Sequence, residues 1–399
     1  MRHQSGDGDI TKNSWDRCNA WQTFLMTAAS NRFDLAVIGA GILGLSCALA
    51  AAQRGLKVIV IERGARALGA SVRNFGLVTI TGQDRDGVWP RARRSREVWS
   101  AVAARAGIPI VNRGQWISAQ RPEAAAVLDA FLRTDMAEGC ELLTPATARR
   151  RCPELCPPGL EAVLWSPHEL RVESRDAIPA LAGWLAREHG VSFRWETAVL
   201  AVDVPRVETS RGPVFAEAAA VCPGDDLATL FPERLGAAGV GRCTLQMMRL
   251  ESPGFTLPGT LMSDLSVARY GGFAKLPEAE ALRRRLESEQ GEYLRRGIHL
   301  IVAQGSDGSL IVGDSHDYVA TPFASERIYE LLLAEYRTAT GQAPPPVRER
   351  WSGTYAIARD RVVLIDAPAP RVRLVLVTSG IGASTGFAIG EEVIGELYG

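Results

Sequence analysis

The stretch FDLAVIGAGILGLSCALAAAQRGLKVIVIERG, residues 33–64, decides the fold of the first part of this chain. Its first apolar run, DLAVIG, is typical of a short buried strand, and KVIVIE is typical of a second one. Between them, Gly39, Gly41 and Gly44 form the pattern G-x-G-x-x-G at the start of a helical segment. This order of strand, turn, helix and strand predicts a unit that binds a dinucleotide.

Each glycine of the pattern has a separate physical reason. Gly39 permits the sharp turn, Gly41 lets the backbone approach a pyrophosphate, and Gly44 allows close packing of the helix on the strand. The helix N-terminus then presents free amides and a positive dipole end to the phosphates. Glu62 ends the second strand, where a carboxylate accepts hydrogen bonds from ribose hydroxyls and disfavours a 2′-phosphate. We therefore expect the following residues to bind the nucleotide: Gly39, Ala40, Gly41, Ile42, Leu43, Gly44, Glu62 and Arg63.

Two further strand-to-turn junctions lie in the middle and at the end of the chain. FAEAAAVCPGDD (215–226) is a short apolar run that ends at Pro223-Gly224, and VRLVLVTSGIGASTGFAIGEEVIGELYG (372–399) is a strand, a glycine-rich turn and a helix. A nucleotide domain assembled from such distant pieces suits a long, extended cofactor such as FAD. The residues expected to contact it from these later segments are Val199, Pro223, Gly224, Gly380, Ile381, Gly382, Ser384 and Thr385.

Together with the W-x-G pattern at 351–353, these motifs resemble one known superfamily from about residue 32 to the C-terminus. It comprises the FAD-dependent amine oxidoreductases related to D-amino acid oxidase, glycine oxidase and sarcosine oxidase. The resemblance implies an α/β fold with a discontinuous, Rossmann-like FAD-binding domain and a substrate domain whose antiparallel sheet covers the flavin ring. It also implies hydride removal from the carbon that bears an amine, which gives an imine that hydrolyses.

The expected division of the chain follows from this resemblance. Residues 32–110, 151–240 and 345–399 form the FAD-binding domain, and residues 111–150 and 241–344 form the substrate domain.

A narrower similarity points to the substrate. SVRNFG (71–76), ARYGGF (268–273), SLIVGDSHDY (309–318) and WSGTYA (351–356) look like a subgroup proposed to act in aminophosphonate catabolism. This similarity implies a small amine that carries an acid group, such as 2-aminoethylphosphonate or its N-methyl or hydroxy derivative.

The segment GASVRNFG, residues 69–76, occupies the place where the superfamily's chain runs along the ribityl group toward the flavin ring. The resemblance implies that Ser71 and Asn74 serve cofactor oxygens. Arg73 is expected at the ring edge or at the substrate's acid group, because a guanidinium makes forked, charge-assisted bonds to carboxylate or phosphonate. The alternative for Arg73 is an ion pair with a surface carboxylate. Phe75 is expected in the core.

Other pocket residues are expected near the flavin ring. GIHLIVAQGSDGSLIVGDSHDY (297–318) is typical of a hairpin with a Ser-Asp-Gly turn, and His316 follows its second strand as a titratable pocket residue. His299 is expected on the first strand. ARYGGFA is predicted to be a strand, so Arg269 and Tyr270 would point to opposite faces, with Tyr270 toward the flavin and Arg269 reaching round the edge.

One departure from the superfamily bears on the substrate. Glycine oxidase-like members carry W-x-G-x-R, whose arginine holds the substrate carboxylate, but this chain has Tyr355 in that place. A differently placed acid group, such as a phosphonate, fits this change. Some sarcosine oxidase-like members attach the flavin through a cysteine near the C-terminus. No cysteine follows Cys243 here, so non-covalent FAD is expected.

Composition limits the partners. The 45 basic and 45 acidic residues cancel, which argues against nucleic acid or an anionic membrane as the main partner. The uncharged run from Leu35 to Ala52 is explained by its glycine spacing rather than by a membrane span. The expected partners are a small-molecule amine substrate and oxygen or another electron acceptor. Seven scattered cysteines without metal-type spacing favour reduced thiols, no metal site and a cytoplasmic location.

Three questions stay open at this point. Residues 1–31 have no periodic pattern and are expected to form a disordered extension, with Met26 as a more natural start. The enzyme could instead be a glycine, sarcosine or D-amino acid oxidase or dehydrogenase. More distant alternatives are an NAD-dependent dehydrogenase and a non-catalytic flavin-binding module.

Overall fold

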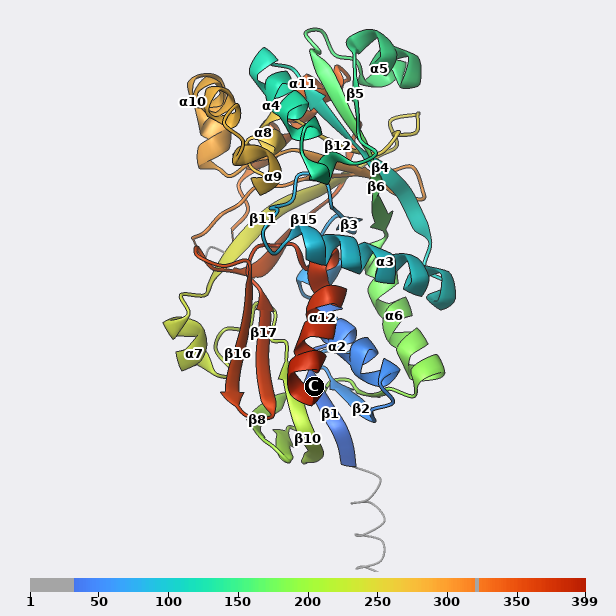
Figure 1. The fold of residues 1–399 in the computed structure, drawn as a ribbon, viewed down its shortest axis with the longest axis vertical. Coiled ribbons are helices and arrows are strands. Elements are labelled where there is room, and N and C mark those ends of the chain that lie inside the picture. The colour runs from blue at the N-terminus through green and yellow to red at the C-terminus, as the bar shows by residue number, and fades with distance from the viewer. Residues whose placement is uncertain (1–31, 320–322) are drawn as a thin grey trace, which may run out of the picture.

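The computed structural model describes residues 32–319 and 323–399, which are built around two large sheets, one in each half of the elongated molecule (Figure 1). The expected extension, with the suggested start at Met26, lies outside the described residues.

The sheet drawn in the lower half contains the first strand, β1 (Arg32–Ile38), at its centre. Its strand order is β16-β17-β10-β1-β2-β7, and the β8–β9 hairpin pairs with β10. Strands β1, β2, β7, β10 and β17 run parallel, and β16 pairs antiparallel with β17. The predicted strands from the beginning, middle and end of the chain are thus neighbours. The other strands are β2 (Val58–Ile61), β7 (Ser192–Arg194), β8 (Val199–Asp203), β9 (Arg206–Thr209), β10 (Val214–Val221), β16 (Val363–Ala369) and β17 (Val372–Val377).

Helices α2 (Ile42–Gln53) and α12 (Gly382–Tyr398) pack side by side over this sheet (Figure 1). A Cβ atom at Gly390 would lie 2.6 Å from the carbonyl carbon of Ser46, so the two helices approach at a distance that glycine permits. The uncharged run noted in the sequence is β1, the glycine turn and α2, all mainly buried. Within residues 32–319 and 323–399, none of the helices has the length and apolar character needed to cross a membrane. The remaining helices of this half are α3 (Trp89–Ala106), α6 (Ser174–His189) and α7 (Pro232–Ala237).

The sheet drawn in the upper half has the order β15-β11-β14-β13-β12-β4-β6-β3, with β5 paired to β6. Its pairs are antiparallel except for β12 with β4. Its strands are β3 (Leu77–Val78), β4 (Ile110–Ala119), β5 (Glu141–Leu143), β6 (Ala162–Val172), β11 (Gly241–Leu250), β12 (Thr260–Met262), β13 (Ile301–Gln304), β14 (Leu310–Gly313) and β15 (Val347–Ile357). Its helices are α4 (Pro122–Leu132), α5 (Pro145–Arg151), α8 (Asp264–Val267), α9 (Gly271–Ala274), α10 (Ala279–Arg295) and α11 (Glu326–Thr340).

This architecture confirms the predicted fold class, a Rossmann-like domain discontinuous in sequence and a second domain around an antiparallel sheet. Three strands depart from the expected division. β3, β6 and β15 were assigned by their ranges to the nucleotide-binding domain, but all three belong to the upper sheet. The chain therefore crosses between the two sheets more often than the motifs indicated.

The hairpin predicted within 297–318 is confirmed as β13 and β14, which pair antiparallel. The strand predicted at ARYGGFA is wrong. There the chain forms the short helices α8 and α9, and Arg269 and Tyr270 lie in the turn between them. The amide of Tyr270 donates to the carbonyl of Ser266 and that of Gly272 donates to Gly82, so helical turns and a loop contact take up these amides instead of a ladder.

Candidate active site

A cavity of about 420 Å³ lies where the N-termini of α2 and α12 meet the upper sheet. It collects segments from all three glycine turns, from the loop after β2, and from β11, β13 and β15. The expected site residues that line it are Gly41, Ile42, Leu43, Gly44, Ser71, Arg73, Asn74, Gly224, Arg269, Tyr270, His316, Tyr355, Gly380, Ile381, Gly382 and Ser384.

The first glycine turn is shaped so that only glycine fits. Gly39 has a φ of +103°, and a Cβ atom there would lie 2.5 Å from the carbonyl oxygen of Cys222. A Cβ atom at Gly44 would lie 1.9 Å from the carbonyl oxygen of Gly39. The start of α2, from Gly41 onward, lines the cavity. The turn therefore presents a helix N-terminus to the cavity, as the binding of a pyrophosphate requires.

Glu62 stands behind this turn and holds it in shape. Its Oε2 accepts a hydrogen bond of 2.9 Å from the amide of Ala40, and its Oε1 accepts one of 2.9 Å from Gly64. A carboxylate has about four acceptor sites, so capacity for ribose hydroxyls remains. Arg63 forms an ion pair of 2.6 Å with Asp226 in the loop after β10. The expected contacts of both residues with the nucleotide stay predictions.

The segment after β2 makes contacts that the sequence did not indicate. The Oγ of Ser71 accepts a hydrogen bond of 3.0 Å from the amide of Ile42, at the start of α2. The Asn74 side chain donates to the carbonyl of Ala70 at 2.8 Å and accepts from the amide of Gly76 at 2.7 Å. Asn74 thus shapes its own turn, and Ser71 fixes the helix start against this segment.

Arg73 is exposed on the cavity wall, and its guanidinium lies 3.4 Å from the carbonyl oxygen of Ser352, to which it donates. Among the described residues it has no carboxylate partner, so the alternative of a surface ion pair finds no support there. Phe75 is buried in the core of the upper half, as predicted.

Arg269 and Tyr270 both line the cavity, although the predicted strand would have turned one of them away. The turn between α8 and α9 lets consecutive side chains share one side. Burial raises the pKa of Tyr270 and of Tyr355, so both phenols stay protonated at neutral pH and can donate hydrogen bonds.

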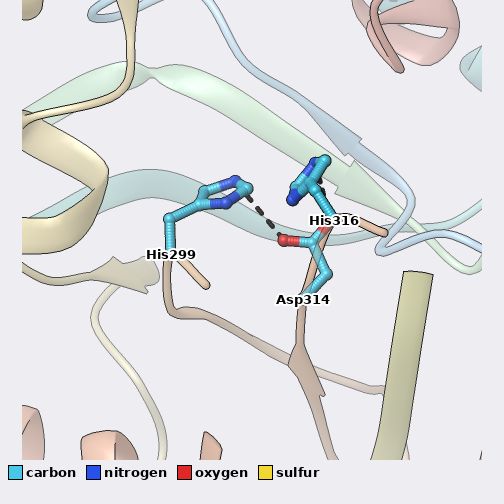
Figure 2. A group of neighbouring side chains, drawn as sticks. All are labelled: His299, Asp314 and His316. Carbon is cyan, nitrogen blue, oxygen red and sulfur yellow. Dashed lines mark ion pairs between the residues drawn. The ribbon is translucent and has the colours of Figure 1, made fainter. Parts of the chain in front are cut away.

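Three buried side chains gather at one wall of the cavity: His299, Asp314 and His316 (Figure 2). The Nε2 of His299 lies 3.3 Å from one carboxylate oxygen of Asp314, and the Nε2 of His316 lies 3.9 Å from the other. Burial lowers the pKa of both histidines well below the usual range. Burial also raises the pKa of Asp314 to about 7, although the positive charge of Arg269 acts in the opposite direction.

The sequence singled out His316, gave Asp314 no role and placed His299 on a strand with a side chain that could face the pocket. His299 lines the cavity but lies just before β13, outside the strand. The sequence did contain a signal for this cluster, in the positions of the three residues next to the predicted hairpin strands. Asp314 and His316 directly follow β14. In the antiparallel pair, Ile301 lies opposite Gly313, so the residues that precede β13 lie beside those that follow β14.

Val199, Pro223 and Thr385 do not line the cavity. Val199 is buried at the start of β8, and Pro223 follows β10. Thr385 donates from its hydroxyl to the carbonyl of Ile381 at 3.0 Å. Ser384, which does line the cavity, accepts a hydrogen bond of 2.9 Å from the amide of Thr79.

Comparison with known proteins gives a consistent result. The family model described as DAO, FAD dependent oxidoreductase, matches residues 34–395. The structure of glycine oxidase from Bacillus cereus superposes with a TM-score of 0.72 at 16% identity, covering 90% of this chain and 93% of that one. The L-α-glycerophosphate oxidase of Mycoplasma pneumoniae, solved with FAD bound, superposes with a TM-score of 0.70 at 16% identity, covering 92% and 94%. At such identities the likeness concerns the fold.

A curated sequence relative matches only locally. The glycerol-3-phosphate dehydrogenase of Mycobacterium leprae is 45% identical over 58 residues, which are 14% of this chain and 9% of that protein. The match thus covers less than a tenth of the relative's length.

Proposed function

The chain belongs to the DAO family of FAD-dependent oxidoreductases, and on that basis we propose that it oxidises a small amine that carries an acid group. Aminophosphonates such as 2-aminoethylphosphonate, or its N-methyl or hydroxy derivative, are the preferred substrates in this proposal. Oxygen or another acceptor takes the electrons. The structural likeness to glycine oxidase is in keeping with an amine substrate.

The observation that carries the proposal is that cationic and hydrogen-bond-accepting groups share one cavity. Arg73 and Arg269 line it together with His316 and Asp314. An amine with an acid group has an anionic end for the guanidinium groups and an ammonium end for the acceptors. Two guanidinium groups suit a phosphonate, which carries more negative charge than a carboxylate.

Tyr355 supports the finer assignment. It lines the cavity. By the resemblance at the W-x-G pattern, it stands where glycine oxidase-like proteins carry an arginine. A protonated phenol donates one hydrogen bond and brings no positive charge. The acid group of the substrate is therefore assigned to Arg73 and Arg269, with Tyr270 and Tyr355 as neutral donors.

The residues present fit FAD. The glycine turn at Gly39 and Gly44 leaves backbone exposed where a pyrophosphate would lie, Glu62 would hold the ribose, and Gly380 and Gly382 stand at the start of α12. When bound, the flavin supplies the hydride acceptor. We propose that it is held without a covalent bond, because no cysteine follows Cys243. A cytoplasmic location belongs to this proposal as well. So do the domain boundaries, apart from the ranges that hold β3, β6 and β15.

His316 is placed to accept a hydrogen bond from the substrate's ammonium group. Because burial lowers the pKa of this histidine well below the usual range, its ring takes the proton only where the cavity also lowers the pKa of the amine. Its Nδ1 donates a hydrogen bond of 2.8 Å to the carbonyl of Gly297, so the neutral ring presents the Nε2 lone pair toward the cavity side. Aliphatic amines have pKa values near about 10, and the amine must be neutral before its carbon releases hydride readily. Removal of this proton is the step in which a side chain of the protein takes part.

Anaerobic reduction of the flavin tests the proposal. We expect 2-aminoethylphosphonate or its N-methyl derivative to bleach the flavin absorption faster than glycine, sarcosine, D-alanine or glycerol 3-phosphate. Faster bleaching by glycine, sarcosine or D-alanine would replace the aminophosphonate with an amino acid and leave amine oxidation in place. Bleaching by glycerol 3-phosphate alone would overturn amine oxidation itself.

A further inference from the structure

The cluster of His299, Asp314 and His316 has unused hydrogen-bonding capacity inside the protein. All three side chains are more than nine-tenths buried, with exposed fractions of 4%, 6% and 7%. The Nδ1 of His299 has no hydrogen-bond partner, and the Oδ1 of Asp314 has only the Nε2 of His299 close by, at 3.3 Å. Leaving a buried polar atom without a partner costs about 1–3 kcal/mol, so the cluster is built to receive a group that donates hydrogen bonds.

The cluster presents acceptors rather than donors on its inner side. Neutral His316 has its proton on Nδ1, fixed by Gly297, and its Nε2 lone pair stands 3.9 Å from a carboxylate oxygen of Asp314. Two lone pairs that face each other repel unless a donor lies between them. One nitrogen or oxygen atom from each of the three side chains can be chosen so that these atoms lie within 4.8 Å of one another, a spacing that one small cation can bridge.

Charge sets the orientation of a ligand in the cavity. The guanidinium of Arg269 lies close enough to lower the pKa of Asp314 and of both histidines. The cavity thus places a guanidinium that can bind an anion near a carboxylate that can bind a cation. An alkylammonium group supplies two or three N–H donors and one positive charge, which matches the acceptors and the charge of the cluster.

We propose that Asp314, His316 and His299 form the binding site for the ammonium group of the substrate, in the same cavity as the arginines that hold its acid group. The carboxylate of Asp314 supplies the counter-charge, and the histidines supply neutral acceptors (Figure 2). This inference rests on the proposed amine oxidation, and it assigns roles to Asp314 and His299 that the sequence did not.

The test compares ligands that differ only in the amine. The probes are 2-aminoethylphosphonate with ethylphosphonate and glycine with acetate, each titrated into the FAD-loaded enzyme without oxygen. Dissociation constants come from flavin reduction or from perturbation of the flavin spectrum. In Asp314→Asn, we expect the amine-bearing member of each pair to bind about tenfold to a hundredfold more weakly, because a charge-assisted hydrogen bond is lost. The amine-free member should change by less than about twofold.

Two further variants keep the result interpretable. Asp264→Asn removes another buried carboxylate, outside the cavity, and should change neither ligand's affinity. If Asp314→Asn loses its FAD, His316→Phe is measured in the same way and should weaken amine binding by about threefold to tenfold.

The outcomes separate the two proposals. If amines reduce the wild-type flavin but both cluster variants bind amines as tightly as wild type, the ammonium site is wrong and amine oxidation stands. If none of the amines reduces the wild-type flavin, amine oxidation itself fails. One equivalent of a divalent metal that is retained by the wild-type enzyme and lost in Asp314→Asn, by elemental analysis, would assign the cluster to a metal ion instead.

Discussion

The indole nitrogen of Trp351 donates a hydrogen bond of 3.1 Å to the carbonyl oxygen of Arg73. This contact joins β15 of the upper sheet to the segment that follows the nucleotide-binding strand β2. Next to it, a Cβ atom at Gly353 would lie 3.4 Å from the same oxygen. The W-x-G pattern therefore fixes the chain at the edge of the cavity, where Arg73 is exposed.

We predict that Trp351→Phe lowers the free energy of unfolding by about 1 kcal/mol, the usual contribution of one hydrogen bond. Urea denaturation of the FAD-loaded protein measures it. Trp89→Phe is the matched control, because the Trp89 indole nitrogen is buried without a partner and its removal should cost no hydrogen bond. Equal losses in the two variants would mean that ring packing alone accounts for the effect.

Gly44→Ala is expected to abolish FAD binding. The added methyl group would stand 1.9 Å from the carbonyl of Gly39, so the turn and the helix start must separate. Flavin absorption per chain after gel filtration gives the measurement. Gly236→Ala, in α7, adds a methyl group where nothing lies within 4 Å and should keep its flavin. A yellow Gly44→Ala protein with full FAD content would contradict the assignment of this turn.

The sequence predicted the nucleotide-binding half well, because glycines at a steric contact leave a fixed spacing. Gly39 and Gly44 touch each other across the turn, and their positions can be read without a structure. The part of the cavity wall that lies in the upper half could not be predicted in this way. His299 lies just before β13 and Asp314 just after β14, and their meeting depends on the register of these two strands. Arg269 and Tyr270 depend on a turn between two four-residue helices, which leave too short a periodic pattern to detect.

Denaturation should release the flavin into the supernatant as FAD. The reason is that cysteines end at Cys243, far before the C-terminal segment. Acid precipitation followed by chromatography of the supernatant identifies the released compound. Yellow colour that stays with the precipitated chain would show a covalent bond and refute the proposal of non-covalent binding.

Arg171→Met should destabilise the protein by about 3–5 kcal/mol, the cost of breaking a buried ion pair. Arg171 is fully buried, donates to the carbonyl oxygens of Phe75 and Gln304 at 2.9 and 2.8 Å, and pairs with Glu173 at 3.0 Å. Thermal and urea unfolding give the size of the loss. Arg85→Met, which removes an exposed ion pair with Asp135, should change stability little. Similar effects in both variants would contradict the structural role of Arg171.

The affinity for amine ligands should depend on pH through Asp314. Burial raises the pKa of this carboxyl to about 7, and below that value it is neutral and loses its attraction for an ammonium group. Affinity should therefore rise by about tenfold per pH unit up to pH 7 and then level off until the amine itself loses its proton near about pH 10. The other charged and titratable groups that line the same cavity are Arg269, Tyr270, His299, His316, Tyr355, Arg73, Asp84 and Cys222.

Comparing glycine with acetate separates the effect of Asp314 on affinity from the effects of those neighbours. The carboxylate of each ligand stays ionised above about pH 5, so its own titration does not interfere. Their inhibition constants against the fastest amine substrate are measured between pH 5.5 and about 9. Burial lowers the pKa of His299 and His316 well below the usual range, so the histidines stay neutral across most of this window. Glycine should show the rise and acetate should not, and Asp314→Asn should flatten the glycine curve. A glycine curve with the same slope in wild type and Asp314→Asn would place the titrating group elsewhere.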